Sequence, residues 1–222
     1  MDKNSIEAAL WNEAKKGFGN ERITLGAYWS YVLNNTPRRL LFTLSHYKFA
    51  AKLLGCGKKV LEVGCNEGVG TLLLAEMAEN VVGIDIDADA IKQASVNFAS
   101  DKIQFINQDI LNNEIGIFDG VVSLDVIEHI YPQNEDAFLT AICQNLSPFG
   151  ICVIGTPNEE AERFSNEISR KAHVNVYSWQ RLKEVMDKYF HQVFMFSAND
   201  ETIHTGFYPM AQYLIAVGVA KT

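Results

Sequence analysis

The chain has 222 residues, of which 48% are hydrophobic and 21% are charged, and its net charge at pH 7 is −8. That length suits one domain with a sizeable core, and the composition is ordinary for a globular protein. The negative charge argues against nucleic acid as a partner, because proteins hold phosphate backbones mainly with clustered Lys and Arg. No apolar run approaches the roughly 18 residues of a membrane span. We therefore expect a small-molecule ligand and no membrane span.

The N-terminal sequence and the cysteines indicate a compartment. The segment MDKNSIEAALWNEAKK lacks the basic region and apolar core of a secretory signal. The four cysteines form no C-x-x-C pair and lie in apolar or glycine-rich surroundings, which is typical of reduced thiols. We therefore expect a cytoplasmic protein.

Residues 1–57 precede the first predicted core strand and are predicted to form an N-terminal helical cap. Pro37 is a favourable helix start, and apolar residues then recur at helical spacing from Leu40 through Leu41 to Leu54, just before Gly55. We expect residues 58–222 to form one α/β domain in the same structural unit.

The stretch from Lys58 to Asp85 has the pattern strand, glycine turn, helix, strand. The β-branched run Val60–Val63 ends at Gly64, and apolar positions return at helical spacing after three further turn residues, Asn66, Gly68 and Gly70. Free N–H groups at such a helix start attract a polar or anionic ligand. Asp85 lies 21 positions after Gly64, close to the roughly 20 expected for an acid that holds ribose hydroxyls. The pattern predicts a nucleoside ligand.

The glycine spacing separates two classes of nucleoside ligand. A dinucleotide site requires G-x-G-x-x-G, but Asn66 and Val69 occupy the second and third glycine positions. The segment LEVGCNEGVG, followed by VVGIDID, instead resembles motif I and the next strand of the class I S-adenosylmethionine-dependent methyltransferases. That family usually has E/D-x-G-x-G-x-G; Asn66 departs from it, and Asn is the non-glycine residue that best accepts positive φ. The resemblance favours S-adenosylmethionine over a nicotinamide cofactor.

This resemblance implies a fold and a set of cofactor contacts. The fold is a doubly wound α/β domain with a mostly parallel seven-stranded sheet, Rossmann-like, under the N-terminal helical cap. The methionine part of the cofactor would lie near Glu62, Gly64, Asn66 and Gly68, and the ribose near Asp85 and Ile86. The segment before motif I commonly folds over the site in this family, which makes five side chains lining candidates: Tyr28, Trp29, Arg38, His46 and Tyr47. Core aromatic residues and solvated charges are the alternative interpretation.

The alternation of helices and strands continues after Asp85. Ala88–Ala99 is predicted to be an amphipathic helix, and IQFINQD a strand that ends at Asp109. The resemblance implies that Asp109 accepts from the adenine amine while the backbone N–H of Ile110 meets a ring nitrogen. A helix-capping or turn role for Asp109 is the alternative.

Within the run from Phe118 to Ile130, a buried fourth strand is predicted that ends at Asp125, where the chain turns into the polar cluster of Glu128 and His129. Ligands bind outside the carboxyl ends of the strands in open parallel sheets, which places Asp125 at the mouth of the site, on the cofactor and near the reaction. A helix, a fifth strand (Ile151–Asn158), another helix and two apolar strands complete the pattern. The segment Ser197–Pro209 between those two strands is predicted to be a loop, whose candidate binding residues are Asp200, Glu201, His204 and Tyr208. A solvated hairpin loop is the alternative.

Catalysis on a hydroxyl acceptor requires removal of a proton, and His129 is the candidate base beside Asp125. Asp125, Glu128 and His129 form a D-x-x-E-H array, and His173 follows the fifth strand. This set resembles the E-x-x-E-H plus distal His metal site of the small-RNA 2′-O-methyltransferases and, more loosely, the E-H pair of the ubiquinone-pathway O-methyltransferases. It implies Mg²⁺ or Mn²⁺ bound by Asp125, Glu128, His129 and His173, if a helix after the fourth strand puts the first three on one face. Asp125 on the cofactor with His129 as a metal-free base, and a purely structural His129, remain alternatives.

The sequence therefore predicts an S-adenosylmethionine-dependent methyltransferase that acts on a small-molecule acceptor, with a hydroxyl favoured over an amine. The loop Ser197–Pro209 and the segment TPRRLLFTLSHYKF weakly resemble bacterial methyltransferases of cell-surface glycan modification, so glycan or lipid metabolism is the expected context. A nucleoside-binding sensor without turnover, N-methylation and aminopropyl transfer are the alternatives. The edge formed by Asp125, Glu128 and His129 favours an enzyme, because a sensor does not need it.

Overall fold

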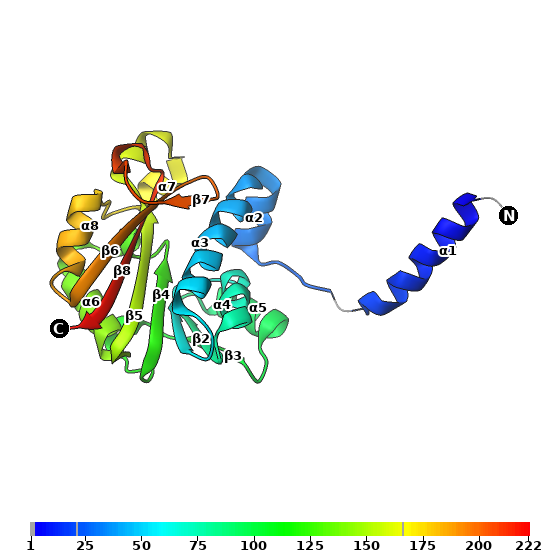
Figure 1. Cartoon of the computed structure of the whole chain (residues 1–222), viewed down its shortest axis with the longest axis horizontal. Helices are drawn as coiled ribbons and strands as arrows, with labels where there is room; N and C mark the ends of the chain where they lie inside the picture. The colour runs from blue at the N-terminus through cyan, green and yellow to red at the C-terminus, as the bar shows by residue number, and fades with distance from the viewer. Residues whose placement is uncertain (1–2, 21, 166) are drawn as a thin grey trace.

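The computed structural model describes residues 3–20, 22–165 and 167–222, and its centre is one mixed β-sheet (Figure 1). The strand order is β3-β2-β1-β4-β5-β8-β6-β7. The strands are β1 (Lys59–Val63), β2 (Asn80–Asp85), β3 (Ile103–Asn107), β4 (Phe118–Leu124), β5 (Leu146–Pro157), β6 (Phe190–Asn199), β7 (Thr202–His204) and β8 (Tyr213–Lys221).

Strands β1 to β5 pair in parallel, whereas β8 runs antiparallel to both β5 and β6. The predicted doubly wound, mostly parallel sheet is therefore confirmed, with one more strand than expected among the described residues. The additional strand is β7, inside the segment Ser197–Pro209 that was predicted to be a loop. Strand β6 continues to Asn199, and Asp200 adopts a φ of 50°, so the chain turns tightly and pairs back on β6.

Helices cover both faces of this sheet (Figure 1). The α-helices of the described part of the chain are α1 (Lys3–Lys15), α2 (Ala27–Asn35), α3 (Arg38–Leu54), α4 (Val69–Met77), α5 (Ala88–Phe98), α6 (Glu135–Gln144), α7 (Glu167–Ala172) and α8 (Trp179–Met186). No helix among the described residues combines the length and apolarity needed to cross a bilayer.

The core is divided by the sheet into two clusters of buried residues. One cluster joins the sheet to α6 and α8, and the other joins it to α3 and α4. Successive residues of a strand point to opposite faces, so Val121 enters the first cluster and Val122 enters the second. This is why the strands read as continuous apolar runs instead of alternating ones.

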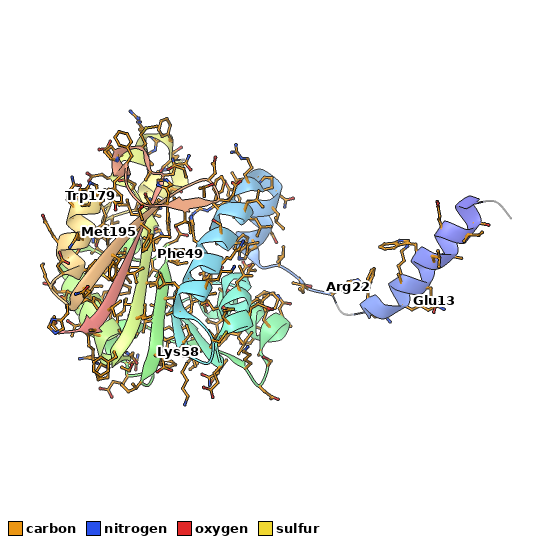
Figure 2. The ribbon with its side chains drawn as sticks, viewed as in Figure 1. Glu13, Arg22, Phe49, Lys58, Trp179 and Met195 are labelled. Atoms are coloured by element: carbon orange, nitrogen blue, oxygen red, sulfur yellow. The ribbon has the colours of Figure 1, made fainter. Side chains whose placement is uncertain are left out.

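Helix α3 follows its sequence signals closely. It begins after Pro37 and ends before Gly55, whose φ of 77° suits a glycine at a helix end. Its buried face packs against α4 and the sheet. Figure 2 shows Phe49 between α3 and the strands, where the centroids of the Phe49 and Phe196 rings lie 4.9 Å apart. Helical spacing placed Leu41 on the apolar face of this helix, but its side chain is 57% exposed, so that prediction is wrong.

The predicted cap over residues 1–57 is divided in space. Helices α2 and α3 lie against the body, whereas α1, which carries Glu13, lies apart from the sheet (Figures 1 and 2). The boundary at residue 57 stays a prediction, because α3 shares a buried cluster with the sheet.

Gly70 in α4 packs against Tyr47 of α3. A Cβ atom at this position would lie 2.2 Å from the Tyr47 ring. We expect Gly70→Ala to lower the free energy of unfolding by about 1–3 kcal/mol through overpacking, measured from urea denaturation midpoints. The matched control is Gly17→Ala, since a Cβ there has nothing within 4 Å. A stabilised Gly70→Ala variant, as helix propensity alone predicts, would contradict this packing.

Candidate active site

A cavity of about 590 Å³ lies at the carboxyl ends of the parallel strands. Its walls come from the ends of β1, β2, β3 and β4 and from helices α2 and α3, where chain segments far apart in sequence meet. This is the edge at which open parallel sheets bind ligands. The strand-end residues that line it are Val63, Gly64, Cys65, Asn66, Ile84, Asp85, Ile86, Gln108, Asp109, Ile110, Leu124, Asp125 and Val126.

Most of the predicted cofactor residues line this cavity. They are Gly64, Asn66, Asp85, Ile86, Asp109, Ile110 and Asp125. Glu62 and Gly68 do not line it and instead contact residues of the protein interior. Glu62 is fully buried and accepts a hydrogen bond of 2.6 Å from the Thr71 hydroxyl, and a Cβ at Gly68 would press on Phe105.

The turn between β1 and α4 has an unusual backbone. Gly64, Asn66 and Gly68 have φ values of 81°, 49° and 78°, so the predicted tolerance of Asn66 for positive φ is confirmed. The Asn66 N–H donates to Asp85 Oδ2 at 2.8 Å, and the Asp87 N–H donates to Asp85 Oδ1 at 2.9 Å. One carboxylate thereby fixes the turns after β1 and β2.

Asp109 performs the capping role that was the alternative to an adenine contact. Its Oδ1 accepts from the Leu111 N–H at 2.9 Å and caps a short 3-10 helix. Asp109 and Ile110 also line the cavity, so the cap does not remove them from the site.

A second cavity of about 830 Å³ adjoins the first, between α2, the start of α5 and the end of α7. Four residues line both cavities: Tyr28, Arg39, Asn66 and His129. Two binding spaces therefore meet at these four side chains.

The predicted cap residues divide into two groups. Tyr28, Trp29 and Tyr47 line the first cavity. Arg38 and His46 line neither cavity, and both predictions are wrong. Arg38 points to solvent, 3.5 Å from the Asp200 carboxylate, and His46 is buried in a stack on Tyr213 with ring centroids 4.1 Å apart.

Arg39 is the cavity residue that sequence reasoning missed. It lies four positions before Thr43 on α3, and the burial of Thr43 in the structure places both on the buried face of the helix. Burial lowers the pKa of the Arg39 guanidinium, but the facing Asp125 and Tyr28 outweigh burial and raise the pKa overall. The pair Arg39 and Asp125 sets the charge at the junction of the cavities.

The array after β4 is not a regular helix. Only a 3-10 helix, Ile127–His129, follows, and Asp125 precedes it with a φ of 57° and its N–H 3.0 Å from the Gly155 oxygen. The predicted four-residue metal set is therefore divided. Within the described residues, one ligand atom each of Glu128, His129 and His173 lies within 4.8 Å of the others, and Asp125 is outside that group.

Glu128 is nearly inaccessible, at 1% exposure. One oxygen accepts from the Thr156 hydroxyl at 3.1 Å, while Oε1 has no hydrogen-bond partner within the described part of the protein. Burial, and then the charge of Asp125, raise the pKa of Glu128 well above its ordinary value.

The two imidazoles beside Glu128 have different environments. His129 Nδ1 lies 3.0 Å from the Ala172 carbonyl oxygen, which can only accept, so Nδ1 carries a proton, and in the neutral imidazole the lone pair is then on Nε2. The His173 ring lies 5.2 Å from that of His129, and burial and then His129 lower the pKa of His173.

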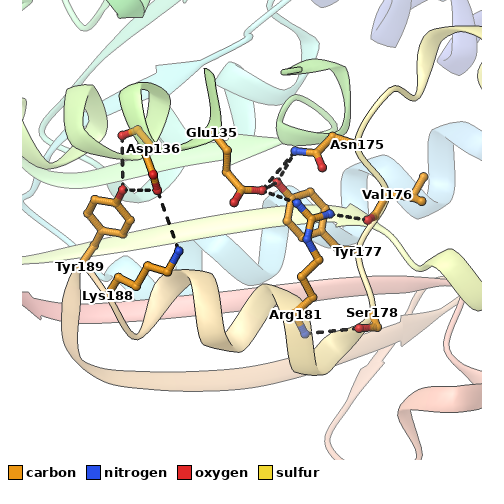
Figure 3. Close-up of polar contacts among 9 residues, drawn as sticks. All are labelled: Glu135, Asp136, Asn175, Val176, Tyr177, Ser178, Arg181, Lys188 and Tyr189. Carbon is orange, nitrogen blue, oxygen red and sulfur yellow. Dashed lines mark hydrogen bonds and ion pairs between the residues drawn. The ribbon is translucent and has the colours of Figure 1, made fainter. Parts of the chain in front are cut away.

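A buried polar network holds the segment that carries His173 (Figure 3). Glu135 accepts from Arg181 Nη2 at 2.6 Å, from Asn175 Nδ2 at 3.2 Å and from the Tyr177 hydroxyl. The Val174 and Asn175 N–H groups donate to the Glu128 carbonyl oxygen at 2.9 and 3.0 Å. The network thus joins α6 and α8 to the backbone of Glu128.

The predicted binding loop lies away from both cavities. Asp200, Glu201, His204 and Tyr208 do not line either one. His204 instead contacts Asn199 Oδ1 at 2.8 Å, and Tyr208 stacks on Trp179 with ring centroids 4.8 Å apart. The segment Ser197–Pro209 is thus a hairpin beside the core, as its alternative interpretation held.

Known proteins resemble this chain in sequence and fold. Residues 54–198 match the family described as methyltransferase domain. A probable S-adenosylmethionine-dependent methyltransferase of Mycolicibacterium smegmatis is 33% identical over 102 residues, which cover 46% of this chain and 39% of that protein. The mitochondrial ubiquinone biosynthesis O-methyltransferase of Homo sapiens is 29% identical over 156 residues, 64% of this chain and 41% of that protein. The matches thus span about two fifths of the length of these curated relatives.

A solved structure has the same fold. N-methyltransferase NodS from Bradyrhizobium japonicum WM9, in complex with S-adenosyl-L-homocysteine, gives a TM-score of 0.64 at 19% identity. The likeness covers 86% of this chain and 91% of NodS.

The buried acid beneath the turn gives a prediction about pH. Burial raises the pKa of Glu62 from 4.5 to about 7, although hydrogen bonds from Thr71 and Tyr47 oppose the shift. The folded state then binds this proton more tightly than the unfolded chain does. The free energy of unfolding therefore falls as the pH rises from 4.5 to 7, by up to about 3 kcal/mol. Glu62→Gln should remove this part of the pH slope in urea denaturation, and Glu76→Gln, on the exposed face of α4, should keep it. Equal slopes in wild type and Glu62→Gln would refute the assignment.

Proposed function

Because this chain belongs to the methyltransferase-domain family, we propose that it is a class I S-adenosylmethionine-dependent methyltransferase and that it methylates a hydroxyl of a small-molecule acceptor. When bound, the cofactor supplies an electrophilic methyl group on its sulfonium. The observation that carries the proposal is the position of His129, which lines both cavities and presents Nε2 as a proton acceptor.

The first cavity suits the cofactor by size and by its polar groups. Its volume of about 590 Å³ lies within the usual range of roughly 300–1,000 Å³ for small-molecule sites. We propose that Asp85 and Ile86 hold the ribose, that Asp109 and the Ile110 N–H hold adenine, and that Gly64 and Asn66 face the methionine part. Glu62 and Gly68 then support the turn from behind.

The second cavity is then the acceptor space. Methyl transfer is an in-line displacement, so the main task of the protein is to align the acceptor oxygen with the methyl carbon. His129 lies at the junction, where its Nε2 would take the hydroxyl proton as the C–O bond forms and the S–C bond breaks. The Nδ1 proton donated to the Ala172 carbonyl holds the ring in that orientation. Asp125, which lines the first cavity, would stabilise the resulting imidazolium.

The acceptor class is a finer proposal. A hydroxyl on a phenol, sugar or lipid head group fits the name of the human relative, an O-methyltransferase. NodS is named as an N-methyltransferase, so an amine acceptor is the alternative. A base such as His129 is required for a hydroxyl, whose pKa is high, and this favours oxygen.

A second version of the site includes a divalent cation. Glu128 Oε1 is buried without a partner in the described structure, and its carboxylate lies beside the imidazoles of His129 and His173. Mixed oxygen and nitrogen ligands of this kind suit Mg²⁺, Mn²⁺ or Zn²⁺. We propose Glu128, His129 and His173 as the ligands, without Asp125; a bound ion would lower the pKa of the acceptor hydroxyl. His129 cannot use Nε2 both as a ligand and as a base, so the two versions exclude each other.

His129 and Asp85 should have separable effects. We expect His129→Gln to lower turnover by about 10²- to 10⁴-fold and to leave the affinity for S-adenosylhomocysteine within about twofold, because the base does not hold the cofactor. Asp85→Ala should instead abolish measurable affinity. Calorimetry with S-adenosylhomocysteine and a methyl-transfer screen across hydroxyl and amine acceptors measure both effects. His191→Gln, on the exposed start of β6, is the control. Full turnover in His129→Gln would refute the base.

Chelation distinguishes the two versions of the site. If His129 acts alone, turnover should be unchanged after dialysis against excess EDTA. If the cation is required, EDTA should abolish turnover, Mg²⁺ or Mn²⁺ should restore it, and His173→Ala should prevent that restoration. His191→Gln should respond to EDTA as the wild type does. Turnover that is unaffected by EDTA excludes the cation from catalysis.

A further inference from the structure

Glu67, in the turn between β1 and α4, is a buried acid that the proposed reaction does not use. It is 3% exposed. None of the ion pairs formed by the described residues includes it. Its carboxylate must therefore be compensated by neutral groups, since a buried charge without partners is costly.

The compensating groups are three main-chain N–H groups at the start of α2. Glu67 Oε2 accepts from the Gly26 N–H at 2.9 Å and from the Trp29 N–H at 3.4 Å, and Oε1 accepts from the Tyr28 N–H at 2.8 Å. The first N–H groups of a helix have no intrahelical partner, and a negative charge is favourable there. The N-cap residue of α2, Gly26, supplies no side-chain cap. A residue 41 positions away along the chain thus caps this helix.

Gly26 is shaped for this contact. A Cβ atom at Gly26 would lie 2.5 Å from the Glu67 carboxyl carbon and from Oε1. Cβ atoms do not make non-bonded contacts that short, so any larger residue would displace the carboxylate. The backbone at Gly26 is extended, with φ −77° and ψ −166°, so the glycine is required for space rather than for its dihedral angles.

The contact joins the cofactor turn to the lid of the same cavity. Asn66, the neighbour of Glu67, lines both cavities and is bound to Asp85. Tyr28 and Trp29, whose N–H groups Glu67 accepts, line the first cavity from the opposite side. The segment before α2 is also held, because Asn97 Nδ2 of α5 donates a hydrogen bond of 2.9 Å to the Thr24 carbonyl oxygen.

We propose that Glu67 is a positioning residue that latches α2 over the occupied cofactor cavity, so that cofactor binding and placement of Tyr28 at the acceptor junction are coupled. The proposal rests on the proposed function only in assigning the first cavity to the cofactor. Loss of the latch should let α2 open while the floor of the cavity stays intact. The cofactor would then enter at its usual rate and leave faster.

The experiment uses S-adenosylhomocysteine as the probe and the conservative variant Glu67→Gln. Gln keeps the volume but loses the charge and one accepting oxygen. We expect the dissociation rate constant of the probe to rise about tenfold and the association rate constant to stay within about twofold. Amide hydrogen exchange should accelerate at residues 26–29 and remain unchanged in β2. Glu76→Gln, an exposed acid on α4, is the matched control and should match the wild type.

Gly26→Ala disrupts the same contact by changing the residue that faces the Glu67 carboxylate. It should raise the dissociation rate in the same way, because its Cβ displaces the carboxylate. The double variant should be no worse than the more affected single variant, since both changes remove one interaction.

Two outcomes would overturn the latch. One is a dissociation rate of the probe that is unchanged in Glu67→Gln, even if the thermal midpoint falls, since a merely structural role would lower stability alone. The other is additive effects of Gly26→Ala and Glu67→Gln. If the wild type does not bind the probe, the cofactor assignment fails instead. Exchange at residues 26–29 in the unliganded protein then decides the latch, which requires faster exchange in Glu67→Gln than in wild type.

Discussion

The site depends on one hydrogen-bonded turn. Asp85 accepts from the Asn66 N–H, and this contact fixes a backbone that passes through positive φ at Gly64, Asn66 and Gly68. Such a backbone is costly for most residues, so the turn needs both the glycines and an acid placed to hold it. It also brings the end of β1 close to the segment after β4, since a Cβ at Gly64 would lie 2.2 Å from Val126 Cγ2. The turn contributes to both cavities, because Asn66 lines each of them.

Features with a local physical cause could be predicted from the sequence. The turn follows from glycine spacing, and Asp85 follows from the length of one strand-helix-strand unit. The limits of α3 follow from Pro37 and Gly55, which act on the backbone at their own positions. The parallel pairing of the first strands follows from the alternation of strands and helices, because a crossover helix returns the chain to start the next strand in the same direction. The same logic places most of the predicted cofactor residues around one cavity.

Features that arise from contacts distant in sequence could not be predicted. Arg38 and Arg39 are adjacent, and only the packing direction of α3 sends Arg39 to Asp125 and Arg38 to solvent. The segment after β4 stops after one 3-10 turn, which separates Asp125 from Glu128. His173 reaches Glu128 because Glu135 binds Asn175, Tyr177 and Arg181. No spacing in the sequence signals that network.

Three buried acids surround the site, and their partners indicate different roles. Glu67 is satisfied by the N–H groups of α2, so it joins two pieces of the chain. Glu62 binds the Thr71 hydroxyl and lies close enough to Tyr47 to raise the pKa of that phenol, so it supports the turn. Glu128 has one partner, Thr156, and its carboxylate lies against two imidazoles at the cavity junction. Glu62 and Glu128 each keep one oxygen, Oε1, without a hydrogen-bond partner among the described residues, but only Glu128 lies beside the imidazoles of His129 and His173. Glu128 is therefore arranged for a ligand or a proton, whereas Glu67 and Glu62 are arranged for the fold.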